Sequence, residues 1–371
     1  MLDSQLSFKT SKNWMGGTLN GISAKLEYIK GLGMDAIWLS PIFVSSAYHG
    51  YSVSDYFDVD PHFGSKSDLK FLVSKAHKLG MKIILDFVAN HVSSTHPFFL
   101  LAQKYKSSNY FHWFLFNSWP SDYEHFLDSK GLPKINLENE EAEKYILEVA
   151  QFWIREFGID GYRLDFAVGP PMSFWNDFAK SCRQLNSNFI LLPEIWLSGL
   201  SKKYLKTMWF VKHDPDQREK LYELLGKKKP SSLDSKGSTE ELAMQIFANV
   251  TNSFLDFPRS FELRKMAEDR KIRSDQFSIT GKGARRFVFL DNHDVERIMW
   301  ECRNDAKLFL ELLELLGSFE NVVVYYGTEI GMTQLKNFRF HSDIEARRFM
   351  KWDLQEDEKQ LLGRFRRVLA Q

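Results

Sequence analysis

Cysteine is nearly absent from this chain of 371 residues, which contains only Cys182 and Cys302. Two cysteines exclude a disulfide framework and a zinc site built from several thiolates, and free thiols favour a reducing compartment. Residues 1–5 have no basic region followed by an apolar run, so we expect no signal peptide. No segment reaches the ~18 apolar residues of a membrane-spanning helix. We therefore expect a soluble cytoplasmic protein with no membrane partner.

An excess of charge of one sign is also missing, because 49 Lys and Arg residues face 48 Asp and Glu residues and the net charge is +1. This balance excludes the basic surface that nucleic acid or an anionic membrane would require of a partner. No Gly-x-Gly-x-x-Gly motif follows a predicted strand, so we expect no dinucleotide and no other cofactor. Aromatic residues, by contrast, are abundant at 15% of the chain.

Short apolar segments alternate with amphipathic segments along the whole chain. Near-continuous apolar strands that alternate with helices imply an α/β fold with a parallel sheet covered on both faces. Eight such units favour a closed (β/α)8 TIM barrel over an open doubly wound sheet. The predicted strands are 2–8, 36–39, 82–87, 162–165, 189–192, 254–257, 286–290 and 322–326. The helices that follow them are 23–32, 67–79, 140–157, 173–185, 238–252, 259–269, 305–316 and 356–370.

Two segments interrupt the alternation. Residues 92–135 are rich in Phe, Trp and Tyr without a clean period, and we expect them to form a small lobe inserted after the third strand. Residues 197–237 form an extended excursion within the barrel, with a basic run at 227–229 that is typical of a solvated face. The remaining residues, 1–91 and 136–371, are predicted to form the barrel itself.

Arg163 and Asp165 lie two residues apart on a predicted strand, so their side chains point to the same side. The guanidinium favours the ionised form of the carboxyl group. An ionised Asp at the C-terminal end of a buried strand suits a covalent nucleophile. A structural ion pair is the more common explanation of one such pair taken alone.

Further polar side chains follow other strands, and strand ends of a barrel converge on one mouth. A crowd of polar groups without a function would carry a large desolvation cost. A divalent metal held by some of them is an alternative, but no His-x-His or Glu-x-x-His pair supports it, and we expect no metal. The residues are Asp86, Asn90, His91, Arg163, Asp165, Glu194, Asn292, His293 and Asp294.

Aromatic residues are predicted around these strand ends, where planar rings beside carboxylates suit a sugar. Packing within the core and the excursions explains about half of them equally well. Two working carboxylates fit the general scheme of glycoside hydrolysis. The aromatic candidates are Trp38, Tyr51, Trp113, Phe114, Trp119, Trp196 and Trp209.

Four ordered motifs resemble the signature segments of the α-amylase family, the family 13 glycoside hydrolases. They are Asp-Phe-Val-Ala-Asn-His at 86–91, Gly-Tyr-Arg-Leu-Asp at 161–165, Glu-Ile-Trp at 194–196 and Leu-Asp-Asn-His-Asp at 290–294. Segments 17–22, 49–51 and 326–332 extend the resemblance across nearly the whole chain. Segment 132–136 resembles one typical of the neopullulanase and cyclomaltodextrinase branch. Within the family, the chain resembles most the neopullulanase/cyclomaltodextrinase/α-glucosidase branch.

The resemblance implies a retaining hydrolase of α-1,4 or α-1,6 bonds in maltooligosaccharides, cyclodextrins or starch-like glucans. Asp165 would be the nucleophile, Glu194 the acid/base, and Asp294 the group that binds the distorted sugar. The substrate-binding residues would be Tyr51, Asp86, His91, Arg163, Trp196, His293, Asp343 and Arg347. A glucanotransferase or isomerase of the same family, and a non-catalytic amylase-like binding subunit, remain as alternatives.

The sequence also departs from the family pattern. We expect no C-terminal β-sandwich, and a homo-oligomer would cover the surface left bare; a monomer in light scattering would count against it. In one branch of the family the loop after the first strand holds calcium, and the matching positions here are Thr10, Lys12, Trp14 and Thr18, so no calcium is expected there. Ser52 replaces an Asp that many exo-acting members place beside the platform Tyr, which favours cleavage inside the glucan over release of terminal glucose.

Overall fold

The computed structural model describes Trp14, Glu219 and residues 17–197, 239–273, 284–337 and 343–369. The chain divides into a large unit, Ala36–Ser253, and a small unit made of Met1–Asp35 and Phe254–Gln371. The strand predicted at 2–8, nearly all of the excursion at 197–237 and the helix cap at Ser238 lie outside the described residues.

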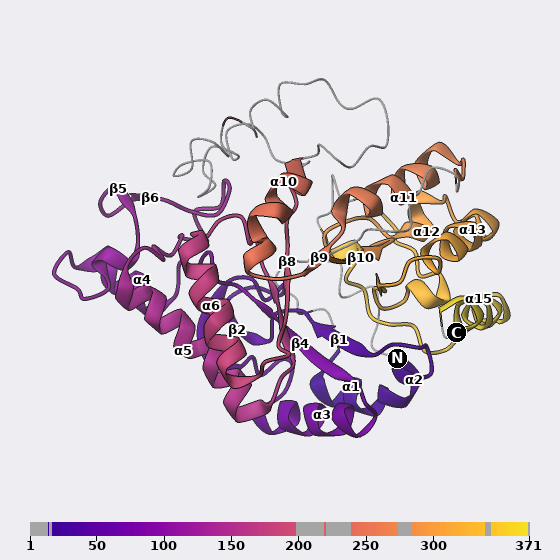
Figure 1. The fold of residues 1–371 in the computed structure, drawn as a ribbon, viewed down its shortest axis with the longest axis horizontal. Coiled ribbons are helices and arrows are strands. Elements are labelled where there is room, and N and C mark those ends of the chain that lie inside the picture. The colour runs from indigo at the N-terminus through magenta and orange to yellow at the C-terminus, as the bar shows by residue number, and fades with distance from the viewer. Residues whose placement is uncertain are drawn as a thin grey trace. The chain divides into compact units, whose positions relative to one another are not determined.

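The large unit is built on a parallel sheet whose four strands follow one another in chain order (Figure 1). They are β1 (Ala36–Leu39), β4 (Lys82–Phe87), β7 (Gly161–Leu164) and β8 (Ile190–Pro193). Every residue of β7 is buried, which agrees with the near-continuous apolar strands expected of a covered parallel sheet. In the register of β4 and β7, Asp86 pairs with Arg163, so the sheet itself brings this carboxylate beside the guanidinium.

Three helices of the large unit lie next to this sheet in Figure 1, and α5 contacts both of the others. Helix α3 (Lys66–Lys78) begins at Ser65 in a capping box with Asp68. Helix α5 (Glu140–Phe157) ends as predicted at Gly158, which has φ 67°. Helix α6 (Met172–Leu185) buries Phe174, Trp175 and Phe178.

Gly161, at the start of β7, allows the close approach of β8. A Cβ atom at this position would lie 2.7 Å from the carbonyl oxygen of Ile190 and 2.9 Å from its Cβ. Both contacts are shorter than packed carbon and oxygen atoms tolerate, so a larger residue would push the strands apart. Since Arg163 lies on β7 and Glu194 directly follows β8, this contact fixes the spacing of the two side chains.

The segment at 92–135 contains more regular structure than the sequence predicts. A helix begins in this segment because the His96 side chain caps it and Pro97 takes the first turn, where no N–H is needed. This lobe contains α4 (Pro97–Lys104), η1 (Phe111–Trp113), β5 (Phe116–Ser118) and β6 (Asp122–Tyr123). The large unit also contains the antiparallel pair β2 (Phe43–Ser45) and β3 (Val53–Val59), α10 (Thr239–Ile246) and η2 (Phe247–Asn249).

The second sheet has the order β11-β10-β9. Its strands are β9 (Ser253–Leu255), β10 (Arg285–Phe289) and β11 (Val322–Val323). The core of the small unit packs leucines of residues 308–316 against neighbours such as Leu263, Val288 and Phe365. Its helices are α1 (Leu19–Ala24), α2 (Leu26–Lys30), α11 (Phe257–Asp269), α12 (Ile298–Glu301), α13 (Ala306–Leu316) and α15 (Glu356–Leu369), with short turns η4 (Thr328–Ile330) and η5 (Asp343–Glu345).

Several predicted boundaries in the small unit are wrong for local reasons. The helix predicted at 23–32 begins earlier, because the Thr18 hydroxyl accepts a hydrogen bond from the Gly21 N–H at 3.0 Å. The strand predicted at 254–257 stops at Leu255, because Asp256 caps α11. The strand predicted to reach 326 stops at Val323, and the chain then turns with a bond from the Thr328 N–H to the Tyr325 carbonyl.

The α/β class is confirmed by the two sheets and the helices that alternate with their strands. The strands β1, β4, β7 and β8 form one sheet, and β9, β10 and β11 form another. Closure of these strands into one barrel stays a prediction. Among the helices in the described ranges, none is long and apolar enough to cross a membrane.

Candidate active site

Arg163 is the centre of a buried cluster in the large unit. Its side chain is 1% exposed, and its Nη1 atom lies 2.9 Å from Asp86 Oδ1 and 2.9 Å from Asp165 Oδ1. Its Nη2 atom lies 2.8 Å from Glu194 Oε1. We call Asp86, Arg163, Asp165 and Glu194 the Arg163 cluster. One guanidinium therefore holds three carboxylates, which the sequence had placed only at the ends of three neighbouring strands.

The charge of Arg163 is set by these neighbours. Burial acts to lower the pKa of the guanidinium, but the acidic groups around it, Asp86 first, raise that pKa above its ordinary value. A buried ion stays charged only when opposite charges and hydrogen bonds replace its water. The cluster supplies both, and it places Asp165 and Glu194 as neighbours on the same planar group.

Aromatic side chains complete the cluster. The Tyr51 hydroxyl donates to Asp86 Oδ2 at 2.9 Å, and the Trp38 indole N–H donates to the same oxygen at 3.2 Å. The Arg163 guanidinium lies 5.3 Å from the centre of the Trp38 ring. Tyr51 also stacks on His49, with ring centres 5.9 Å apart. Tyr51 is predictable from the sequence, whereas the contact of His49 with it is not, although the motif at 49–51 contains both.

The backbone directly after Asp165 is strained in a way that serves the cluster. Phe166 has φ 40°, which is unfavourable for a large side chain. In this conformation its N–H donates to Glu194 Oε2 at 2.8 Å. Strained backbone of this kind is characteristic of functional sites. Glu194 is thus held through one oxygen by Arg163 and through the other by the main chain, and period-2 patterns do not reveal the second contact.

A second cluster lies in the small unit and contains four of the predicted catalytic and substrate-binding residues. His293 Nε2 lies 2.9 Å from Asp294 Oδ2, and Arg347 Nη2 lies 3.8 Å from Asp294 Oδ1. Arg347 Nε also pairs with Asp343 Oδ2 at 2.6 Å. The Asn292 side chain accepts the Asp294 N–H at 2.8 Å. We call His293, Asp294, Asp343 and Arg347 the Asp294 cluster.

His91 follows β4 and is fully buried. Burial lowers the pKa of its ring to about 3, so the imidazole is neutral at ordinary pH. Its ring stacks on Phe126 at 4.8 Å, and its Nε2 atom has no hydrogen-bond partner among the described residues. An unpaired buried nitrogen is costly. A neutral imidazole with a free ring nitrogen suits a hydrogen bond to a ligand hydroxyl.

His96 makes a pH-dependent contribution to stability that can be tested. Burial lowers its pKa to about 4, while the unfolded chain binds the proton near ~6.5. The unfolded state therefore holds more protons between these values, and the free energy of unfolding should fall by ~3 kcal/mol as the pH drops through them. His96→Asn keeps an acceptor for the Phe98 N–H and removes this titration.

Urea unfolding of His96→Asn should therefore give a flatter pH dependence between ~6.5 and ~4 than the parent chain. The exposed residue His112 provides the control, because His112→Asn should leave the slope unchanged. Equal slopes in the parent chain and His96→Asn would contradict the assignment of this proton to His96.

The other aromatic residues predicted near the strand ends differ in their surroundings. Trp196 is half-buried and lies two residues after Glu194. Trp209 lies outside the described residues. Trp113, Phe114 and Trp119 pack within the lobe and against α5, which agrees with the alternative that part of these aromatics serve core and excursion packing. Phe114 packs on Phe99 at 5.0 Å, and Trp119 donates to the Ala102 carbonyl at 3.1 Å. Trp113 contacts Phe98, Tyr110 and Tyr145.

The proposed metal alternative gains no support from the arrangement of ligands. Across the described ranges, no group of three or more His, Cys, Asp and Glu side chains is arranged to hold a metal ion. The carboxylates of Asp86, Asp165 and Glu194 are instead directed at Arg163.

Comparison with known proteins gives a family match over nearly the whole chain. The family described as "Alpha amylase, catalytic domain" matches residues 5–366. Alpha-amylase 2 of Dictyoglomus thermophilum is 35% identical over 365 residues, which cover 96% of this chain and 58% of that protein. The intracellular maltogenic amylase of Bacillus subtilis is 31% identical over 363 residues, which cover 96% of this chain and 55% of that protein.

The chain thus spans a little over half the length of these relatives. Other relatives carry the names cyclomaltodextrinase and neopullulanase. Among solved structures, the α-amylase of Geobacillus thermoleovorans in complex with acarbose aligns with a TM-score of 0.69 at 27% identity. That alignment covers 98% of this chain and 74% of the other.

Proposed function

The chain belongs to the α-amylase family, and from this premise we propose that it is a retaining glycoside hydrolase of α-glucans. The observation that carries the proposal is that one buried guanidinium, that of Arg163, holds Asp165 and Glu194 side by side. Retaining glycosidases need two carboxyl groups close together, one to attack the sugar and one to exchange protons.

In the proposed reaction, Asp165 attacks the anomeric carbon and forms a covalent glycosyl-enzyme. The Arg163 guanidinium keeps Asp165 ionised, as a carboxylate nucleophile requires. Glu194 gives its proton to the leaving glycosidic oxygen and then takes a proton from the attacking water. We assign Asp294 to the hydroxyls of the distorted sugar, by its place in the fourth motif.

Glu194 must carry a proton to act as the acid. In this structure both of its oxygens accept hydrogen bonds, one from Arg163 Nη2 and one from the Phe166 N–H. Such donors favour the ionised carboxylate. We propose that substrate binding displaces Glu194 from Nη2, which frees Oε1 for the proton that it transfers.

Substrate contacts follow from the same clusters. We propose that Tyr51 provides a ring face for the glucose at the cleavage point and that the neutral ring of His91 hydrogen-bonds one of its hydroxyls. Trp196, His293, Asp343 and Arg347 are assigned to the same substrate by their motifs. Because Ser52 stands beside Tyr51, we propose cleavage within maltooligosaccharides or cyclodextrins.

The names of the relatives guide the choice of substrates for a test. Maltotriose, β-cyclodextrin, pullulan and soluble starch should be offered to the parent chain and to Asp165→Asn, with product analysis and NMR of the first product formed. We expect maltooligosaccharide products that appear as the α-anomer and depend on Asp165. A β-anomer would exclude retention, and strict stepwise release of glucose would exclude internal cleavage.

We also propose an intracellular location. Support comes from the name of the Bacillus subtilis relative, which describes an intracellular maltogenic amylase.

A further inference from the structure

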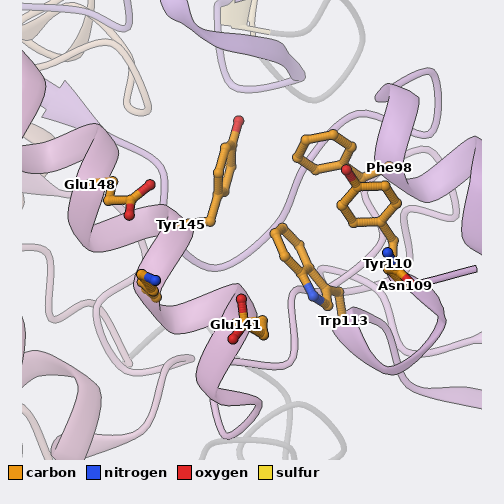
Figure 2. A pocket seen from close by; sticks show the side chains of 8 residues that line it. Phe98, Asn109, Tyr110, Trp113, Glu141, Tyr145 and Glu148 are labelled. Atoms are coloured by element: carbon orange, nitrogen blue, oxygen red, sulfur yellow. The ribbon is translucent and has the colours of Figure 1, made fainter.

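A cavity of about 620 Å³ lies in the large unit between the lobe and α5 (Figure 2). It shares no residue with the Arg163 cluster. Its size falls within the ~300–1,000 Å³ typical of small-molecule sites. The lining residues are Phe98, Asn109, Tyr110, Trp113, Glu141, Lys144, Tyr145 and Glu148.

One wall of the cavity is a stripe along α5. Glu141, Lys144, Tyr145 and Glu148 are spaced so that they share one face of the helix. The core-facing residues of α5, such as Ile146 and Val149, lie on another face. Glu141, Lys144 and Glu148 are exposed, and within the described residues none of the three forms an ion pair. Their charged groups are therefore available to a ligand.

The other wall is aromatic. Figure 2 shows the rings of Phe98, Tyr110 and Trp113 across the cavity from Glu141 and Glu148, with Tyr145 projecting from α5. Phe98 and Tyr110 stack at 4.0 Å with an angle of 8° between their planes, and Trp113 meets Tyr110 edge-on at 5.0 Å. All three are half-buried, so they combine a fixed orientation with accessible ring surface.

We propose that this cavity is a second glucan-binding site, which holds a part of the polysaccharide remote from the bond that is cleaved. The ligand class rests on the proposed function of the Arg163 cluster. Half-buried rings provide flat surfaces for the C–H faces of glucose units. Hydroxyl groups of the sugar find hydrogen-bond partners at the rim of the cavity. The carboxylates of Glu141 and Glu148 accept hydrogen bonds, the ammonium of Lys144 donates them, and the amide of Asn109 does both.

A cationic ligand is the competing interpretation, because aromatic rings and carboxylates also bind quaternary ammonium groups. Two observations favour the sugar. Lys144 brings a positive charge into the lining, which repels a cation. Phe98 and Tyr110 also cover one face of each other, so they do not form a cage of open ring faces.

Binding can be measured without turnover by affinity electrophoresis through gels that contain soluble starch, with Asp165→Asn as the background. Addition of Trp113→Ala should weaken retardation on the order of tenfold, as expected for the loss of one well-packed aromatic anchor. The double substitution Glu141→Ala/Glu148→Ala, which changes only exposed side chains, should also weaken it. Trp119→Ala is the matched control, because this lobe tryptophan does not line the cavity, and it should be retarded normally.

Kinetics then separate this inference from the proposed function. With Asp165 intact, Trp113→Ala should lower kcat/KM for soluble starch on the order of tenfold and leave kcat/KM for a short chromogenic maltoside unchanged. A parent chain that hydrolyses neither substrate would refute the proposed function, while the starch gels would still test the cavity. Normal retardation of both cavity variants would refute the second site. The second site would also be refuted if saturation-transfer NMR showed that tetramethylammonium binds in a Trp113-dependent way and that maltoheptaose does not.

Discussion

Asp165→Asn should abolish turnover even on glucosides with an activated leaving group, whereas Glu194→Gln should spare the first chemical step on those substrates. The amide of Asn cannot attack the anomeric carbon, so no covalent intermediate forms. The expected loss is on the order of 10⁴-fold or more, as found when one member of a coupled catalytic set is removed. On a substrate such as a dinitrophenyl maltoside, the leaving group departs without the proton that Glu194 supplies.

For Glu194→Gln, the second step should become limiting, because no base activates the attacking water. The loss on ordinary glucans should be about 10²–10⁴-fold, which is the usual contribution of general acid–base catalysis. Rapid-mix kinetics should show a burst of dinitrophenolate, and azide should accelerate the second step by attacking the intermediate directly. Asp177→Asn, an exposed carboxylate on α6, is the control and should retain full activity.

The two variants are distinguished by which chemical step of the reaction they lose. If Asp165→Asn also gave a burst, or if azide rescued Asp165→Asn with retention of configuration and did not rescue Glu194→Gln, the assigned roles would have to be exchanged. If both variants kept full activity on starch, the Arg163 cluster would not be the catalytic centre.

The centre of this site was predictable from the sequence because it depends on local geometry. The two-residue spacing of Arg163 and Asp165 along a strand fixes their common direction, and the structure confirms it with a contact of 2.9 Å. Gly158 was identified as the end of α5 for an equally local reason, its left-handed conformation.

Other contacts depend on packing that no period in the sequence encodes. The bond between Arg163 Nη2 and Glu194 requires the register of β7 on β8 and the close approach at Gly161. The hydrogen bond from the Phe166 N–H requires a positive φ that its residue type disfavours. Trp113 was expected near the strand ends, but the fold of the lobe turns it towards α5. Hydrophobic patterns predict that an aromatic residue is buried and do not predict against which partner.

Removal of the Arg163 side chain is expected to have the largest effect on stability. Arg163→Met keeps most of the apolar stem and deletes the charge, which leaves Asp86, Asp165 and Glu194 buried without their shared partner. Loss of one member of a buried ion pair destabilises by ~3–5 kcal/mol, because the remaining charge is uncompensated. Urea unfolding at pH 7 measures this difference. Arg155→Met is the control, because Arg155 is exposed and its side chain donates to Gln151, and it should change stability by less than ~0.5 kcal/mol.

The pH dependence of that difference identifies its electrostatic origin. At acid pH, protonation of the carboxylates in Arg163→Met removes the uncompensated buried charge that destabilises this variant, so its deficit relative to the parent chain shrinks. The unfolding free energies of the parent chain and Arg163→Met should therefore converge in acid. A difference that stays constant with pH would instead indicate lost packing of the Arg163 stem between Trp38 and its neighbours, and the cluster would then owe its stability to shape and not to charge.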